Sequence, residues 1–259
     1  MSLFKLARIL ILLTVFVVLA FSAKRDKLHS RSWAEPLDVV VYPINADDGS
    51  AEVEQYIGDL DDQRFEAVDR FFRRQSEGYE LIAASPTRMR LGQVLDELPP
   101  AAPRPDAGYP AIVWWGVQFR YWIFRHTPDD DADIRVLALY HEAKEGRRLP
   151  HSLGLDKGLV AVVHAFANSR QDAQNNVVIA HELLHTVGAT DKYDADNQPI
   201  FPDGYADPEQ SPLYPQTHAE IMAGQVALSE NDSRMAENLN QCVIGERTAR
   251  EINWLIDEQ

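Results

Sequence analysis

The segment from His181 to Asp191 has the residue types and the spacing of a catalytic zinc site. It reads H-E-x-x-H-x-x-G-x-x-D. On a helix, His181 and His185 share one face, where two imidazoles can bind one Zn²⁺ and leave coordination positions open. Glu182 is placed to act as general base for a metal-activated water. Gly188 can end the helix in a left-handed conformation, after which Asp191 can return a carboxylate oxygen to the metal.

The stretch around the two histidines has the pattern of a buried helix. Apolar residues recur through it at helical spacing: Val177, Val178, Ala180, Leu183, Leu184 and Val187. Asp172 or Asn175 stands where a side chain can cap the helix start. Histidines that are only packed would fit the apolar stripe, but they would not explain a glycine and an aspartate at the motif's offsets. The pattern therefore favours a metal site.

A second segment, residues 219–224, follows the predicted helix after a loop rich in Pro and Asp and reads A-E-I-M-A-G. Together with the zinc motif, this segment resembles the Met-turn of the metzincin metallopeptidases. The closest pattern is that of the small secreted snapalysin-like group, in which Asp replaces the usual third histidine. The resemblance covers about residues 158–256, and residues 246–255 fit the family's terminal helix.

The resemblance implies a role for each motif residue. His181, His185 and Asp191 would be zinc ligands, and Glu182 would be the general base. Met222 would be the Met-turn residue, which shapes the floor beneath the ligands without binding the metal. An ordinary core methionine is the alternative for that position.

Two features leave alternatives open around the site. Some metzincins carry a tyrosine two residues after the Met-turn methionine, but Gly224 stands there in this chain, so no such tyrosine is assigned. Tyr193, two residues past Asp191, can approach the site instead. For the third ligand Asp191 is favoured, with His218 and Glu220 as alternatives. Glu220 would make this the site of a gluzincin, although prolines between the two segments argue against the long helix that such a site needs.

The order of predicted elements fits an α+β fold. We expect strands at 37–44, 79–84, 134–141 and 159–166, and helices at 51–74 and 112–124 before the zinc helix. By the resemblance, the fold is metzincin-like: a twisted mixed sheet, an edge strand directly before the zinc helix, a Met-turn and a C-terminal helix. Residues 159–166 would be that edge strand, and an exposed edge can bind an extended peptide by strand addition.

The apolar segment 112–124 contains three tryptophans and three other aromatic residues beside Arg120 and Arg125. Its length favours a helix over a strand. A place in the core is the default for such a segment. A surface that contacts a membrane or a substrate is the alternative, because aromatic residues with nearby arginines suit an interface.

The N-terminus carries a candidate export signal. Lys5 and Arg8 precede an apolar run from Ile9 to Phe21 that only Thr14 interrupts, which is the layout of a secretory signal peptide or an uncleaved membrane anchor. We therefore expect residues 1–23 to be a signal or anchor, 24–36 a linker and 37–259 one catalytic domain. The protein would then be exported, either secreted or tethered outside the cytoplasm.

Composition narrows the partners. The net charge of −15 disfavours nucleic-acid binding. One cysteine, Cys242, excludes an intrachain disulfide, and residues 24–36 hold no cysteine for a thiolate switch. The loop 191–207 is rich in Asp, including Asp194, Asp196, Asp203 and Asp207. A Ca²⁺ site there is the alternative to a solvated loop that shapes the cleft.

These observations predict an exported zinc endopeptidase that acts on a peptide or protein substrate, with the specificity-determining residues unknown. The alternative is a non-enzymatic, zinc-stabilised envelope domain that binds peptides or a partner. The intact Glu182 favours the enzyme, because a purely structural zinc site has no use for a general base.

Overall fold

The computed structural model describes residues 29–79, 81, 83–104, 106–128, 131–156 and 158–255, together with Lys5, Arg8 and Thr14. The predicted signal or anchor run, apart from these three residues, lies outside that part of the chain. Within the described part, no helix combines the length and the apolar character needed to cross a membrane.

A five-stranded sheet forms the centre of the molecule, with strand order β2-β1-β3-β5-β4. Its strands are β1 (Leu37–Asn45), β2 (Thr87–Leu91), β3 (Ile134–His141), β4 (Leu153–Leu155) and β5 (Val160–Phe166). Four of the strands are parallel, and only β4 runs antiparallel to its neighbour β5. The chain therefore combines helices with a mostly parallel mixed sheet.

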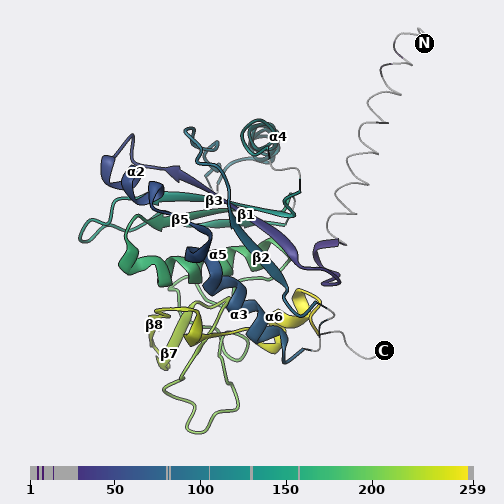
Figure 1. Ribbon diagram of the computed structural model, residues 1–259. Helices are drawn as coiled ribbons and strands as arrows, with labels where there is room; N and C mark the ends of the chain where they lie inside the picture. Colours follow the sequence, from purple (N-terminus) through teal and green to yellow (C-terminus); the bar gives the residue numbers. More distant parts are fainter. Residues whose placement is uncertain are drawn as a thin grey trace.

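Helices cover both faces of this sheet (Figure 1). The helices α2 (Ala51–Gly58), α3 (Glu66–Ser76) and α5 (Asp172–Thr186) pack on one face, and α4 (Tyr109–His126) lies on the other. Successive side chains of a strand point to opposite faces. In β3, Val136 and Ala138 join the core beneath α5, while Leu137 and Leu139 join the smaller core beneath α4. Burial on both faces explains why β3 and β5 are nearly continuous apolar runs.

The chain after α5 forms a second layer beside the zinc-motif helix. It contains the two-stranded pairs β6 (Ala219–Glu220) with β9 (Cys242–Val243) and β7 (Gln225–Ser229) with β8 (Asp232–Met235), and the helix α6 (Glu246–Glu251). Short 3₁₀ turns lie at Asp62–Phe65, Ser169–Gln171 and Leu239–Gln241.

Part of the predicted linker packs against this layer. The Trp33 ring is 1% exposed, and its indole N–H donates to the Ile252 carbonyl at 2.6 Å. The Trp33 ring also meets that of Trp254 edge-on, with ring centroids 5.5 Å apart. The segment around Trp33 and the residues that follow α6 are therefore held together by the core.

The sheet corrects three sequence-based predictions. Residues 159–166 are a strand, but β5 is interior, and the edge is the antiparallel β4. The second strand lies at Thr87–Leu91 instead of 79–84. The single helix predicted over 51–74 is two helices, separated after Gly58 by an acidic stretch in which Asp62 accepts a hydrogen bond from the β2 backbone at 2.6 Å. By contrast, the apolar segment 112–124 is helical as predicted, within α4.

Candidate metal centre

Helix α5 presents two imidazoles that converge with a carboxylate on one point. The Nε2 atoms of His181 and His185 are 3.1 Å apart. Oδ1 of Asp191 lies 3.2 Å from the first and 3.1 Å from the second. Ligand atoms held about 2.0–2.2 Å from a tetrahedral Zn²⁺ are roughly 3.3 Å from one another. The triangle therefore has nearly the size that one zinc ion requires.

The hydrogen bonds on the far side of each imidazole support this fit. His181 Nδ1 lies 3.0 Å from the Ile221 carbonyl oxygen, and His185 Nδ1 lies 2.9 Å from the Ala189 carbonyl oxygen. Carbonyls only accept, so each Nδ1 carries the proton and each neutral ring turns the lone pair of Nε2 toward the centre. Two lone pairs and a carboxylate that face one another repel electrostatically, and a cation between them would remove that repulsion.

Backbone geometry at Gly188 brings Asp191 back to the histidines. Gly188 has a φ of +106°, the left-handed conformation that its place in the motif predicts. A Cβ at this position would also fall 1.6 Å from a guanidinium nitrogen of Arg31. The chain reverses here and the Ala189 N–H donates to the Leu184 carbonyl at 3.0 Å, so the loop starts in a fixed direction.

The charges around the triangle favour an ionised Asp191. Burial opposes ionisation of this carboxyl, but its close contacts with the imidazoles of His181 and His185 outweigh burial and hold its pKa well below the usual range. Burial also opposes a charged His185, yet the Asp191 carboxylate and the Ala189 carbonyl raise the pKa of this histidine. The site is thus built to stabilise positive charge next to Asp191.

Glu182 lies next to this triangle with the environment of a base. Its side chain is buried, its Oε2 makes no hydrogen bond, and its carboxylate comes within 4.8 Å of both histidine ligand atoms. Burial raises the pKa of Glu182, against the lowering effect of the two histidines and of the Gly154 N–H. A buried carboxylate oxygen without a partner is costly, which makes Oε2 of Glu182 a candidate acceptor for the proton of a bound water.

The chain from Glu220 to Gly224 forms the predicted tight turn beneath the site. The N–H groups of Ala223 and Gly224 both donate to the Glu220 carbonyl, at 3.0 and 2.9 Å. Met222 is fully buried, and its own carbonyl accepts from the Lys192 N–H at 3.0 Å. The Ile221 carbonyl of this turn contacts His181 directly, and the Met222 carbonyl holds Lys192, the residue next to Asp191. The main chain of the turn therefore supports two of the candidate ligands.

The two alternative third ligands take other roles. Both carboxylate oxygens of Glu220 are occupied: they accept from the backbone of Met222, Ala223 and Gly245 and from the Thr248 hydroxyl. Glu220 therefore supports the turn from inside. His218 is exposed and its Nδ1 pairs with the Thr217 hydroxyl at 2.9 Å. Only Asp191 of the three candidates reaches the histidines.

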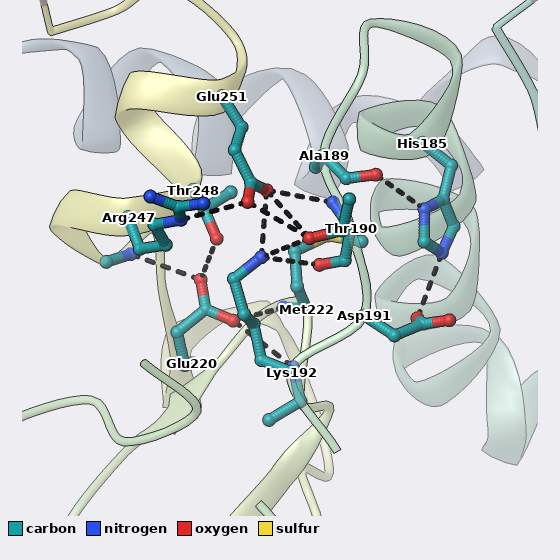
Figure 2. Close-up of polar contacts among 12 residues, drawn as sticks. His185, Ala189, Thr190, Asp191, Lys192, Glu220, Met222, Arg247, Thr248 and Glu251 are labelled. Carbon is teal, nitrogen blue, oxygen red and sulfur yellow. Dashed lines mark hydrogen bonds and ion pairs between the residues drawn. The ribbon is translucent and has the colours of Figure 1, made fainter. Parts of the chain in front are cut away.

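A buried ion pair holds the residues on both sides of Asp191 (Figure 2). Lys192 Nζ lies 2.8 Å from the Glu251 carboxylate of α6, and it also donates to the Thr190 carbonyl and hydroxyl. The same carboxylate accepts from the Thr190 N–H at 2.9 Å. Lys192 and Glu251 are 59 positions apart, and sequence analysis did not find this pair because such a contact leaves no local pattern.

Tyr193 reaches the site, as its position two residues after Asp191 suggested. Its ring stacks on that of His181 with centroids 6.3 Å apart, and the Asp191 carboxylate acts on its hydroxyl. Burial and the neighbouring negative charge raise the pKa of Tyr193 to about 12. The phenol is therefore a proton donor at neutral pH.

The edge strand β4 passes directly against the zinc-motif helix at Gly154. A Cβ on this glycine would lie 2.4 Å from the Glu182 carbonyl oxygen and 2.4 Å from the His185 Cβ. The sheet order leaves the outer side of β4 without a neighbouring strand. Gly154 thus allows a sheet edge to run alongside the candidate base and a candidate ligand.

Two smaller predictions need correction. Neither Asp172 nor Asn175 caps α5: Asp172 instead pairs with Arg64 and accepts from the Tyr56 hydroxyl, and Asn175 binds the Phe166 backbone. In the acidic loop after Asp191, the described residues Asp194, Asp196, Asp203 and Asp207 form no group with metal-binding spacing, so the Ca²⁺ alternative finds no support there. Asp194 instead accepts from two backbone N–H groups of its own turn.

Comparison with known proteins gives only distant likenesses. No protein-family model matches the chain, and no curated protein matches it. Crystal structures of OgpA from Akkermansia muciniphila are similar: the wild-type protein at 12% identity and a TM-score of 0.39, over 83% of this chain and 59% of that one. Catalytically inactive OgpA in complex with an O-glycopeptide substrate is similar at 11% identity and a TM-score of 0.34, over 73% and 53%.

A chaperone–substrate complex is also similar, at 13% identity and a TM-score of 0.34, over 86% of this chain and 35% of that one. This chain spans less than two thirds of the length of each of these proteins. Likenesses this slight indicate no activity, so the function has to be inferred from the geometry of the site.

Proposed function

We propose that this chain is a zinc-dependent endopeptidase of metzincin type, with His181, His185 and Asp191 as metal ligands. The observation that carries the proposal is the convergence of two Nε2 lone pairs and one carboxylate oxygen within 3.1–3.2 Å, beside a buried carboxylate that has one oxygen without a partner. The donor set of two imidazoles and one carboxylate leaves a fourth position open, as catalytic zinc sites do.

When bound, Zn²⁺ would supply Lewis acidity to a substrate carbonyl and to a water molecule. Glu182 would take the proton from that water, because its Oε2 is free of protein partners and lies beside the ligand atoms. It would then deliver the proton to the leaving amine. The raised pKa of Glu182 suits this double duty, since a base for neutral conditions works best when its pKa is closer to neutrality.

Tyr193 would act as a second donor in the same step. Its hydroxyl is protonated at neutral pH and lies on the ligand Asp191, and its ring rests on His181. From this place it can donate to negative charge that develops on the carbonyl oxygen of the substrate.

The substrate would bind as an extended peptide along β4. Leu153–Leu155 pairs with β5 on one side only, so its outer backbone groups can add one more strand. Because Gly154 touches α5 at Glu182 and His185, a peptide on that edge would run past the metal position. This replaces the interior strand β5, which the sequence had suggested for the role.

The test is hydrolysis of an unfolded protein substrate by the zinc-loaded chain, run beside Glu182→Gln. We expect cleavage by the natural chain, at least about a thousandfold slower cleavage by Glu182→Gln, and equal zinc binding by both. An active Glu182→Gln protein would refute the mechanism. A chain that loses zinc in this variant would instead make Glu182 a ligand.

The second candidate function is a zinc-stabilised domain that binds peptides without cleaving them. The free edge of β4 is the observation that favours it, because strand addition alone gives binding. Zinc binding and peptide binding without hydrolysis of any of a varied set of unfolded proteins would support this function. Export of the chain is part of the proposal for both functions, the endopeptidase and the peptide-binding domain.

A further inference from the structure

Helix α4 turns an apolar and aromatic face away from the protein. The residues that pack on the sheet are Phe119 and Trp122, with Trp115 half-buried. Most of the other large apolar side chains of the helix are exposed, with these fractions: Tyr109 79%, Ile112 44%, Val113 48%, Trp114 63%, Val117 53%, Tyr121 65% and Phe124 81%. A continuous exposed face of this kind marks an interaction surface.

Four of the exposed residues lie on one stripe of the helix. Val113, Val117 and Tyr121 follow one another at intervals of four, and Phe124 comes three residues later. Arg120 lies about 55° to one side of the centre of this stripe and Arg125 about 85° to the other, given ~100° per residue. The face therefore has an apolar and aromatic centre with one cation along each margin.

Charge indicates which occupant this face suits. Between Asp106 and Asp129 the sequence contains no acidic residue, although Asp and Glu number 40 in the chain and its net charge is −15. The helix thus has no negative side chain and carries arginines, although the molecule as a whole is acidic. A second copy could cover this face with its own α4, but that helix brings the same two arginines and no acidic residue to pair with them. An anionic lipid surface supplies both an apolar layer and negative headgroups.

We propose that α4 is a membrane-contact helix that lies flat on an anionic phospholipid surface. Tryptophan and tyrosine prefer the headgroup boundary, where their apolar rings contact lipid and their polar tips remain hydrated. Val117 and Phe124 enter the acyl boundary, and the two arginines meet the phosphates. Because α4 and α5 lie on opposite faces of the sheet, this contact leaves the candidate metal centre uncovered (Figure 1).

The test uses the full chain with a fluorophore on one introduced cysteine. Val117→Cys places the fluorophore on the stripe, and Met235→Cys, on the distant hairpin of β7 and β8, is the matched control. Both variants keep the apolar N-terminal run, so attachment through that run affects them equally. The natural Cys242 is buried, and the unsubstituted chain treated with the same reagent measures its background.

The labelled chains are mixed with vesicles of phosphatidylcholine and phosphatidylglycerol that carry a nitroxide-labelled lipid as quencher. We expect quenching at position 117 and little at position 235. Omitting phosphatidylglycerol, or replacing both arginines by Arg120→Gln and Arg125→Gln, should weaken the quenching, by about fivefold in affinity for each arginine.

Equal quenching at the two positions, or none at either, would overturn the proposal. Disulfide cross-linking of Val117→Cys between two chains, without lipid quenching, would overturn it in favour of a second copy as the occupant. Quenching at position 117 that does not depend on phosphatidylglycerol or on the arginines would overturn the requirement for anionic lipid.

Discussion

The ammonium of Lys192 lies 2.8 Å from the carboxylate of Glu251, and this buried pair ties the loop that carries Asp191 to the C-terminal helix α6 (Figure 2). The pair also binds Thr190, so both neighbours of the candidate ligand are fixed from the same point. Residues that orient a metal ligand without touching the metal commonly set its affinity. Glu251 is therefore expected to be a positioning residue for the metal centre.

Replacing this carboxylate should weaken both the fold and the site. Glu251→Gln leaves the buried Lys192 without its counter-ion, which should lower the free energy of unfolding by about 2–4 kcal/mol. It should also lower zinc affinity by about tenfold, because Asp191 is held less firmly. Chelator competition measures the affinity, and urea unfolding measures the stability. Arg247→Gln is the control, since it removes only an exposed partner of the same carboxylate. Unchanged zinc affinity in Glu251→Gln would contradict the positioning role.

The two acidic candidates for third ligand should separate cleanly. Asp191→Ala should lower zinc affinity by more than about 100-fold with little loss of stability, because its carboxylate is partly exposed and contacts the histidines. Glu220→Gln should do the reverse: it disturbs four hydrogen bonds, three of them buried, and should cost about 2–3 kcal/mol of unfolding free energy while zinc remains bound. Loss of zinc in Glu220→Gln at full stability would restore the gluzincin arrangement.

Gly154→Ala should damage catalysis through the edge strand. The added methyl group would lie 2.4 Å from two atoms of α5, so β4 has to move away from Glu182 and His185. A displacement of about 1 Å at a catalytic site can lower kcat/KM by about 100-fold. Peptide hydrolysis measures the loss, and Gly58→Ala, whose Cβ would meet no atom within 4 Å, is the control. Full activity of Gly154→Ala would remove β4 from the proposed substrate path.

Tyr193→Phe should lower turnover without releasing the metal. The variant keeps the ring on His181 and loses only the hydroxyl donor. We expect kcat to fall by about 10–100-fold with KM and zinc affinity nearly unchanged, because the donor acts on charge that develops in the transition state. A matching fall in zinc affinity would show that the hydroxyl serves the ligand Asp191 instead.

A histidine pair on the other face of the sheet should make stability depend on pH. His164 Nδ1 lies 2.9 Å from His141 Nε2, and His141 is paired in turn with Asp47, which Arg147 also contacts. Burial and the neighbouring His141 lower the pKa of His164 from 6.5 to about 4. The unfolded chain therefore takes up a proton near pH 6.5 that the folded chain resists until about pH 4.

The free energy of unfolding should therefore fall as the pH is lowered: the contribution of His164 to stability is complete above pH 6.5 and is lost as the pH falls toward 4. Because the ring is only half-buried, the loss should be about 1–2 kcal/mol, less than the full shift would give. Urea unfolding at pH 7 and pH 4.5 measures it. His164→Asn should flatten the dependence, and the exposed His151→Asn should not. An unchanged slope in His164→Asn would assign the effect to other groups.

The helix that bears the site could be predicted because its signals are local. Four-residue spacing puts His181 and His185 on one face, and only Gly188 in the motif tolerates the observed φ of +106°. The strand at β5 could also be recognised from its run of apolar residues. Its place inside the sheet could not, because β4, its outer neighbour, has three residues and is too short to form a pattern.

The strand β2 carries a recognisable signal in the sequence. Thr87–Leu91 alternates Met89, on the buried face, with Arg88 and Arg90, and such alternation indicates a half-buried strand. The stretch before it is more apolar but has no alternation, so apolar character alone points to the wrong segment. Similarly, the exposed face of α4 could not be told from a core face, because both are apolar and only packing against the sheet decides which side is covered.

By itself, the sequence determined which residues could bind a metal and which could act as a base on its water, since residue type and spacing along one helix are properties of a short segment. Tertiary structure decided what holds them there: the Ile221 carbonyl on His181, the Lys192–Glu251 pair beside Asp191, and the passage of Gly154 along α5. These contacts join residues 28 to 59 positions apart. Long-range packing brings such residues together, and contacts of this kind leave no periodic pattern in the sequence from which they could be predicted.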